Sequence, residues 1–293
     1  MFLNEARLSA RMNHPHVVQV YEVAEHEGLP VIVMEYLDGH SLASILAGAF
    51  DLPAFTRELR LTIMTKVLAG LHYAHTLRDF SGRALELVHR DVTPQNVMVT
   101  YDGQVKVVDF GVAQMGGSSR RQRTHKIAGK LGYMAPEQMH GRCDRRADVF
   151  AAGILLWELS TLRRFWGKQK EADVMRQLLA FDIPQRRTLA AEMGDELAQI
   201  CGRALAPDPA ARYATAAEMQ AELERYLLAH SSFVMESTIG QLVQRACGGQ
   251  GVKSRSTMAP WMGHLDAPLV QGVLNGAPSA GAAAFVINEE TPK

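Results

Sequence analysis

The chain has 293 residues, 47% of them hydrophobic, and its 31 basic and 31 acidic residues balance to a formal net charge of zero. A chain of this length can bury one large core or two modest ones, and its charge balance does not favour a dedicated nucleic-acid binder. The cysteines Cys143, Cys201 and Cys247 form no C-x-x-C pair, which argues against a zinc or redox motif of that kind and suits a reducing cytoplasm.

The first predicted elements along the chain are a surface helix and a β-hairpin. Residues Phe2 to Met12 alternate apolar and charged side chains as in an amphipathic helix. The β-rich runs Val17 to Val23 and Leu29 to Tyr36 are separated by a polar turn, which predicts two paired strands. The N-terminus has no basic-then-apolar leader pattern, so we expect a soluble cytoplasmic protein without a membrane span.

Helical patterns dominate the rest of the chain. Ser41 is placed to cap a short helix through Ala47, and Arg57 to Leu77 predicts a long one. The segment from Leu87 to Val112 is β-branched and interrupted by turns, so we expect loops flanking short strands. Further helices are predicted at residues 148–161, 172–179, 195–206 and 214–230. We place one domain at residues 1–230 and a largely flexible extension, with one more amphipathic stretch through Gln244, at residues 231–293.

Three motifs in the middle of the chain occur in a meaningful order. His89-Arg90-Asp91, with Asn96 five residues after its aspartate, is followed by Asp109-Phe110-Gly111 and by Ala135-Pro136-Glu137. Together they resemble the protein kinase family, specifically the bacterial serine/threonine kinases of eukaryotic type. The resemblance implies an α+β fold with a small β-rich N-lobe, here residues 1–37 and incomplete, and a mostly helical C-lobe at residues 38–230.

The resemblance also implies transfer of the ATP γ-phosphoryl group to serine or threonine hydroxyls of protein substrates. Asp91 would accept the hydroxyl proton, while Asn96 and Asp109 would hold Mg²⁺ through hard oxygen ligands. The alternative for Asp91 and Asp109 is that they only cap their loops. The joint order of the motifs favours the chemical interpretation over loop capping.

The resemblance assigns the adenine site to the end of the predicted hairpin. Met34 would be the gatekeeper, and backbone groups of Glu35 and Leu37 would pair with the adenine edge. Taken alone, such a run is also typical of a buried strand end. Glu5 matches the helix glutamate that holds a lysine of the family's third strand.

Other positions match structural and regulatory residues of the family. Asp148 would support the catalytic loop, and Arg212 would pair with Glu137. Arg90 is the arginine that a phosphate on the activation loop would neutralise. Among Ser118, Ser119 and Thr124, we prefer Thr124 as the phosphorylated residue. The alternative is that these hydroxyl groups have no regulatory role. Segment 130–134 resembles the serine/threonine form, which does not favour tyrosine specificity.

The chain departs from the family pattern in two respects. Lys130 stands where a threonine is usual and Thr93 where a lysine is usual, so we hypothesise that the two exchange roles. No Gly-rich loop and no lysine precede Lys66, which suggests an N-terminally truncated kinase. The alternatives are a pseudokinase-like module that binds partners without catalysis, and a product that does not fold. The sequence leaves the oligomeric state open.

Overall fold

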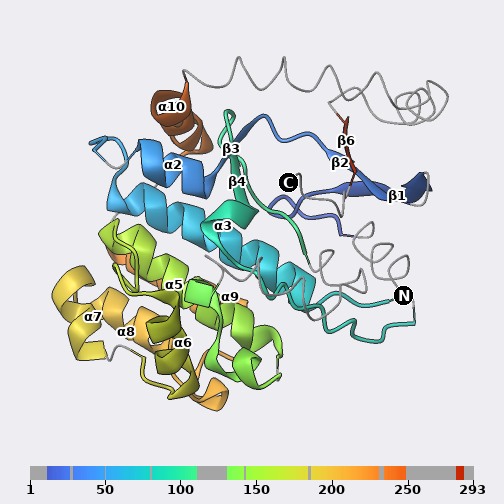
Figure 1. Cartoon of the computed structure of the whole chain (residues 1–293). Helices are drawn as coiled ribbons and strands as arrows, with labels where there is room; N and C mark the ends of the chain where they lie inside the picture. Colours follow the sequence, from blue (N-terminus) through green and yellow to red (C-terminus); the bar gives the residue numbers. More distant parts are fainter. Residues whose placement is uncertain are drawn as a thin grey trace.

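The computed structural model describes residues 12–26, 29–49, 51–79, 81–110, 131–141, 143–183, 186–230, 234–248 and 282–286. The helix predicted from Phe2 lies outside these residues except for Met12, which is not helical. Glu5, Thr124 and Lys130 also lie outside them. Figure 1 shows strands on one side of the long helix α3 and a group of helices on the other. This arrangement agrees with the expected α+β fold of a small β-rich part and a mostly helical part.

An antiparallel sheet forms the small β-rich part. Strands β1 (Val20–His26) and β2 (Leu29–Glu35) make the predicted hairpin, which is confirmed. Strand β6 (Ala282–Val286) pairs with the other edge of β2, giving the order β1-β2-β6. The sequence pattern of that terminal segment did not predict a strand.

A second sheet connects the β-hairpin to the helices. It contains β3 (Gly39–Ser41), β4 (Val97–Thr100) and β5 (Val105–Val107), in that order. Val107 extends the connection, since its carbonyl accepts from Val18 N–H at 3.0 Å and its N–H donates to the His16 carbonyl at 3.0 Å. The β4–β5 hairpin is therefore fixed to the segment that leads into β1.

The first two helices of the described residues begin at predicted caps or boundaries. Helix α2 (Leu42–Gly48) starts after Ser41, whose hydroxyl accepts a hydrogen bond from Ser44 N–H. Helix α3 (Arg57–His75) starts after Thr56, which accepts from Leu59 N–H. Such caps satisfy amide groups that have no partner inside the helix.

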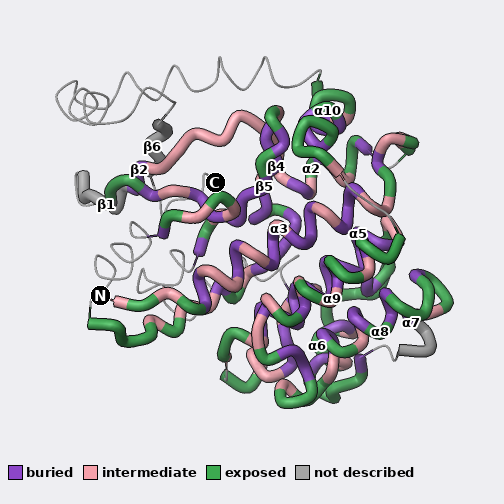
Figure 2. The backbone as a smooth tube through the Cα atoms, turned by 180° about the vertical axis from the view of Figure 1, so that it is seen from behind, coloured by how far each residue is buried: buried purple, intermediate pink, exposed green. Residues whose placement is uncertain are grey.

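The helical part is organised around one buried helix. Helix α5 (Arg145–Thr161) is buried from Ala147 to Ser160, and Figure 2 shows it enclosed by neighbouring helices. Helices α7 (Arg186–Met193), α8 (Asp195–Ala204) and α9 (Ala216–Ala229) contact α5, whereas α6 (Glu171–Leu179) lies against the two 3₁₀ turns that precede α5. Short 3₁₀ turns lie at Pro94–Asn96, Leu131–Tyr133, Pro136–His140 and Pro209–Ala211. Helix α7 was not predicted, whereas the other four match predicted helices.

One more helix follows the proposed domain boundary. Helix α10 (Glu236–Cys247) lies beside α2, β3 and β4, where Ile239, Leu242 and Val243 are fully buried. The predicted amphipathic stretch is thus a packed helix, and part of the extension belongs to the folded body. The boundary near residue 230 itself stays a prediction. Of the helices in the described part of the chain, none has the length and apolarity needed to cross a membrane.

Candidate functional site

The loop from His89 to Asn96 is held together by its own side chains. The Asn96 amide Nδ2 donates to the Asp91 carboxylate and to the Asp91 carbonyl, both at 2.8 Å. His89 Nδ1 lies 3.3 Å from Asp91 N–H, and His89 Nε2 lies 2.9 Å from the Val108 carbonyl. These contacts fit one tautomer, in which Nε2 carries the proton and Nδ1 accepts. The hydrogen bonds from Asn96, in the 3₁₀ turn at the end of this loop, therefore orient the Asp91 carboxylate.

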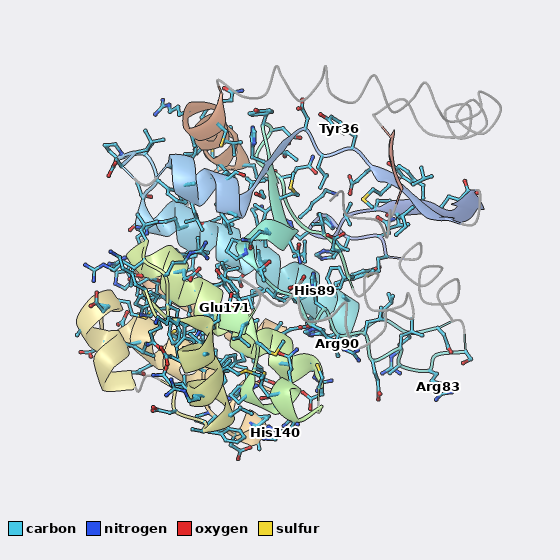
Figure 3. The ribbon with its side chains drawn as sticks, in the orientation of Figure 1. Tyr36, Arg83, His89, Arg90, His140 and Glu171 are labelled. Atoms are coloured by element: carbon cyan, nitrogen blue, oxygen red, sulfur yellow. The ribbon has the colours of Figure 1, made fainter. Side chains whose placement is uncertain are left out.

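Asp148 of α5 supports this loop from below. Arg90 has a φ of 66°, a left-handed conformation that is unfavourable for a residue with a side chain. The Asp148 carboxylate accepts from the His89 and Arg90 N–H groups, each at 2.7 Å. In Figure 3 the labelled His89 and Arg90 lie side by side near one end of α3. The hydrogen bonds to Asp148 offset the unfavourable backbone conformation of the loop.

His75, in the last turn of α3, is a partner of this carboxylate that sequence reasoning missed. Its Nε2 lies 2.8 Å from Asp148 Oδ2, and both side chains are buried. Burial by itself raises the pKa of Asp148, but the hydrogen bond and charge of His75 and the nearby His89 outweigh it and hold the pKa below its usual range. In the sequence, His75 is only a histidine on the predicted buried face of a helix. Such a histidine is often an ordinary core residue, so its role as a partner of Asp148 could not be predicted.

Asp109 follows β5 and lies close to the same loop. The Val108 N–H donates to the Asn96 carbonyl at 3.0 Å, so the two ends of the β4–β5 hairpin are joined. Asp109 has a φ of 62° and an exposed side chain, while the Phe110 ring lies 4.5 Å from the His89 ring. The structure thus brings the segments of Asp91, Asn96 and Asp109 together.

A small cavity joins Asp109 to the predicted adenine site. It has a volume of about 20 Å³ and is lined by Met12, Val18, Val20, Ile32, Met34, Asp109 and Phe110. Met34 of β2 and Asp109 after β5 therefore face one space, although they are far apart in the sequence. The lining of this cavity is mostly apolar.

The Glu35 side chain takes part in a contact that the sequence analysis did not predict. Its Oε1 lies 2.7 Å from Lys106 Nζ and accepts from the Gln19 N–H at 2.7 Å. Both Lys106 and Glu35 are largely buried, so this ion pair fixes the end of β2 to β5. Leu37 lies in the half-buried segment that follows, beside Tyr36, which Figure 3 labels.

Glu137 and Arg212 form the ion pair that the resemblance implied. Arg212 donates through both terminal nitrogens to the Glu137 carboxylate, at 2.6 and 2.8 Å. It also donates to the Ala206, Pro207 and Arg146 carbonyls, and its side chain is fully buried. This arrangement satisfies the guanidinium group and ties the turn after Ala135 to the loop before α9.

Comparison with protein families gives one match that covers most of the chain. The family model for the protein kinase domain matches residues 1–223. A curated relative, the tyrosine-protein kinase MasK of Myxococcus xanthus, is 36% identical over 263 residues, which are 87% of this chain and 40% of MasK. The serine/threonine-protein kinase PrkC of Bacillus subtilis is 29% identical over 76% of this chain and 33% of PrkC.

Further relatives are also protein kinases, and they match a similar share of this chain. The probable serine/threonine-protein kinase SCO3848 of Streptomyces coelicolor is 36% identical over 77% of this chain and 33% of its own length. Among solved structures, the PknI kinase domain of Mycobacterium tuberculosis matches with a TM-score of 0.57 and 28% identity, covering 76% of this chain and 77% of that domain. The chain thus spans between 33% and 40% of the three curated relatives described here.

Proposed function

Because the chain belongs to the protein kinase family, we propose that it transfers the γ-phosphoryl group of ATP to serine or threonine hydroxyls of protein substrates. The observation that carries the proposal is the joined loop and hairpin, in which Asn96 bonds Asp91 and Val108 bonds Asn96. Relatives named as serine/threonine-protein kinases support the same hydroxyl class.

The donor groups fit Mg²⁺. Asn96 uses its amide nitrogen to bond Asp91, which turns its amide oxygen away from that carboxylate. The exposed Asp109 carboxylate provides a second hard oxygen donor, the ligand type that Mg²⁺ prefers. We therefore assign Asn96 and Asp109 as the residues that would hold the ion. When bound, Mg²⁺ neutralises charge on the transferred phosphoryl group.

Asp91 would act on the attacking hydroxyl. Its carboxylate accepts from Asn96, which fixes its orientation. We propose that it accepts the hydroxyl proton as the new P–O bond forms and the bond between the γ-phosphorus and the β–γ bridging oxygen breaks, with ADP as the leaving group. Asp148 would act indirectly, by accepting hydrogen bonds from the His89 and Arg90 amides and so positioning the loop. The half-buried Met34 and the backbone of Glu35 and Leu37 would receive the adenine ring.

Phosphorylation of Thr124 would regulate the site. Arg90 is exposed next to Asp91, and the resemblance to the family implies that a phosphate on Thr124 would neutralise its guanidinium group. The exchange of roles between Thr93 and Lys130, and the pairing of Glu5 with a lysine, also stay proposals.

A transfer assay with Mg-ATP and a generic protein substrate tests the function. We expect phosphate incorporation by the chain and its loss, by roughly a hundredfold or more, in Asp91→Asn, because that change removes the proton acceptor but keeps the shape. The control is Asp51→Asn, an exposed aspartate outside the site. Equal incorporation by the chain and Asp91→Asn would contradict the proposal.

Tyrosine is a second candidate acceptor. The 36% identity to a relative named as a tyrosine-protein kinase favours it. Acid hydrolysis of the labelled substrate and separation of the phosphoamino acids distinguishes the two, and we expect phosphoserine and phosphothreonine. Phosphotyrosine as the main product would replace the serine/threonine assignment.

A partner-binding module without catalysis is not favoured, since the named relatives are kinases. Mg-dependent ATP binding without transfer by the chain would revive it. Use of ATP as the phosphoryl donor suits the cytoplasmic location expected from the sequence.

A further inference from the structure

Helix α10 contacts the β4–β5 hairpin at very short backbone distances. A Cβ atom added to Gly240 of α10 would lie 2.3 Å from the Tyr101 carbonyl oxygen. A Cβ atom added to Gly103, in the turn between β4 and β5, would lie 1.8 Å from the Glu236 carbonyl oxygen. Only a residue without a side chain permits either approach, so helix and turn fit each other through two glycines.

The apolar face of α10 secures this contact. Ile239, Leu242 and Val243 are fully buried against α2, β3 and β4. At the first turn of α10, Glu236 Oε1 lies 2.6 Å from Lys66 Nζ of α3. The helix is therefore fixed both to the hairpin and to the long helix behind it. Figure 1 shows α10 beside β3, β4 and α2.

The hairpin that α10 contacts connects the two proposed metal-binding residues. Asn96 immediately precedes β4. Asp109 follows β5, which ends at Val107, and only Val108 lies between them. The strands are held by the register Val97–Val107 and Val99–Val105, and the turn by the Gly103 N–H donating to the Thr100 carbonyl. A shift of the turn would move both ends of this short hairpin.

We propose that α10 is a positioning element for phosphoryl transfer: by clamping the Tyr101–Gln104 turn, it sets the relative position of Asn96 and Asp109. The inference rests on the proposed function, because it concerns the residues assigned to Mg²⁺. It adds that a segment beyond the residues 1–223 that match the kinase family helps to form the metal site. Displacement of α10 would weaken Mg-ATP binding even though no residue of the loop from His89 to Asn96 is replaced.

The test uses the full chain with Gly240→Ala. Alanine has a higher helix propensity than glycine, so α10 itself should form better, while the added Cβ atom forces it off the turn. The matched control is Gln241→Ala on the exposed face of the same helix. Two quantities are measured: amide hydrogen exchange at Tyr101, Gly103 and Gln104, and the Mg²⁺ concentration at which ATP binding is half-maximal.

We expect Gly240→Ala to exchange faster at the turn and to need roughly ten- to hundredfold more Mg²⁺, the loss of affinity typical when the support of a metal ligand is disturbed. Amide exchange in α5 should not change. The control Gln241→Ala should equal the unchanged chain in both measured quantities. Faster exchange with unchanged Mg²⁺ dependence would overturn the proposal, since α10 would then only cover the core. Unchanged exchange would overturn it as well.

A second variant applies if Gly240→Ala does not fold. Glu236→Gln removes the ion pair with Lys66 and keeps the size of the side chain. A smaller shift of both quantities in the same direction is expected, and no shift in either would contradict the clamp. Exchange and ATP binding do not require phosphate transfer. A chain that binds Mg-ATP but transfers nothing would therefore refute the proposed function and leave this inference to be decided by the binding data.

Discussion

At the scale of single residues, the Asp148 carboxylate connects three elements. It belongs to α5 and accepts from His75 of α3 and from two amides of the loop from His89 to Asn96. A buried carboxylate with this many donors is stable as an anion, which explains its lowered pKa despite complete burial. The loop therefore depends on one side chain far from it in the sequence.

Replacement of this carboxylate gives a sharp prediction. Asp148→Ala should lower the free energy of unfolding by about 3–5 kcal/mol, because it leaves the His89 and Arg90 amides and the His75 ring without their buried acceptor. Urea denaturation measures the loss as a lower midpoint. Asp51→Ala, at an exposed aspartate, is the control and should shift the midpoint little. Equal midpoints for the two variants would mean that Asp148 does not support the loop.

At the scale of elements, β6 covers an edge of β2 that would otherwise be open. Five residue pairs join the two strands, from Val31–Val286 to Glu35–Ala282. An uncovered edge strand offers unpaired amides and carbonyls to other chains, so this pairing protects the small sheet from association.

Proline tests this protection, because it cannot donate to a strand ladder. The double variant Ala283→Pro, Ala284→Pro changes consecutive positions, so one of them must lose an amide that points at β2. We expect faster amide exchange in β2 and concentration-dependent self-association by light scattering. Exchange in α5 serves as the internal control. A variant that stays monodisperse with protected β2 amides would show that the edge needs no cover.

The elements differ in how far the sequence predicts them. The Ser41 cap and the helical spacing from Arg57 are local signals, and both gave helices where expected. The motif order predicted that Asp91, Asn96 and Asp109 would meet, and their segments do. Strand β6 was missed because an alanine-rich run carries little β preference and its pairing with β2 is a non-local contact. His75 and Lys106 were missed for a related reason, since their carboxylate partners come from other elements.

At the scale of the whole molecule, a second buried carboxylate makes stability depend on pH. Glu158 of α5 accepts from Tyr133 O–H at 2.5 Å and from Phe165 N–H at 3.1 Å. Burial raises the pKa of Glu158, and the hydrogen bonds only partly offset this effect. The folded state therefore keeps the proton in a range of pH where the unfolded chain has lost it.

The pKa shift of Glu158 determines whether the free energy of unfolding rises or falls with pH. Stability from this group is fully present below the unfolded pKa of about 4.3 and is lost as pH rises through the higher folded value. Glu158→Gln cannot ionise, so its stability relative to the unchanged chain should improve as pH rises over that interval. Urea denaturation at a series of pH values measures the difference. The control Glu224→Gln, at an exposed carboxylate of α9, should follow the unchanged chain at every pH, and a Glu158→Gln curve parallel to it would refute the prediction.

The docking of α10 also affects the order in which the parts of the chain can fold during synthesis. The surface formed by α2, β3 and β4 is complete once residue 100 has left the ribosome, but Ile239, Leu242 and Val243 arrive much later. At about 5–20 residues per second, synthesis leaves that apolar surface exposed for roughly 7 to 29 seconds. A chaperone that recognises apolar grooves has this interval in which to bind the nascent chain, and the arrival of α10 ends it.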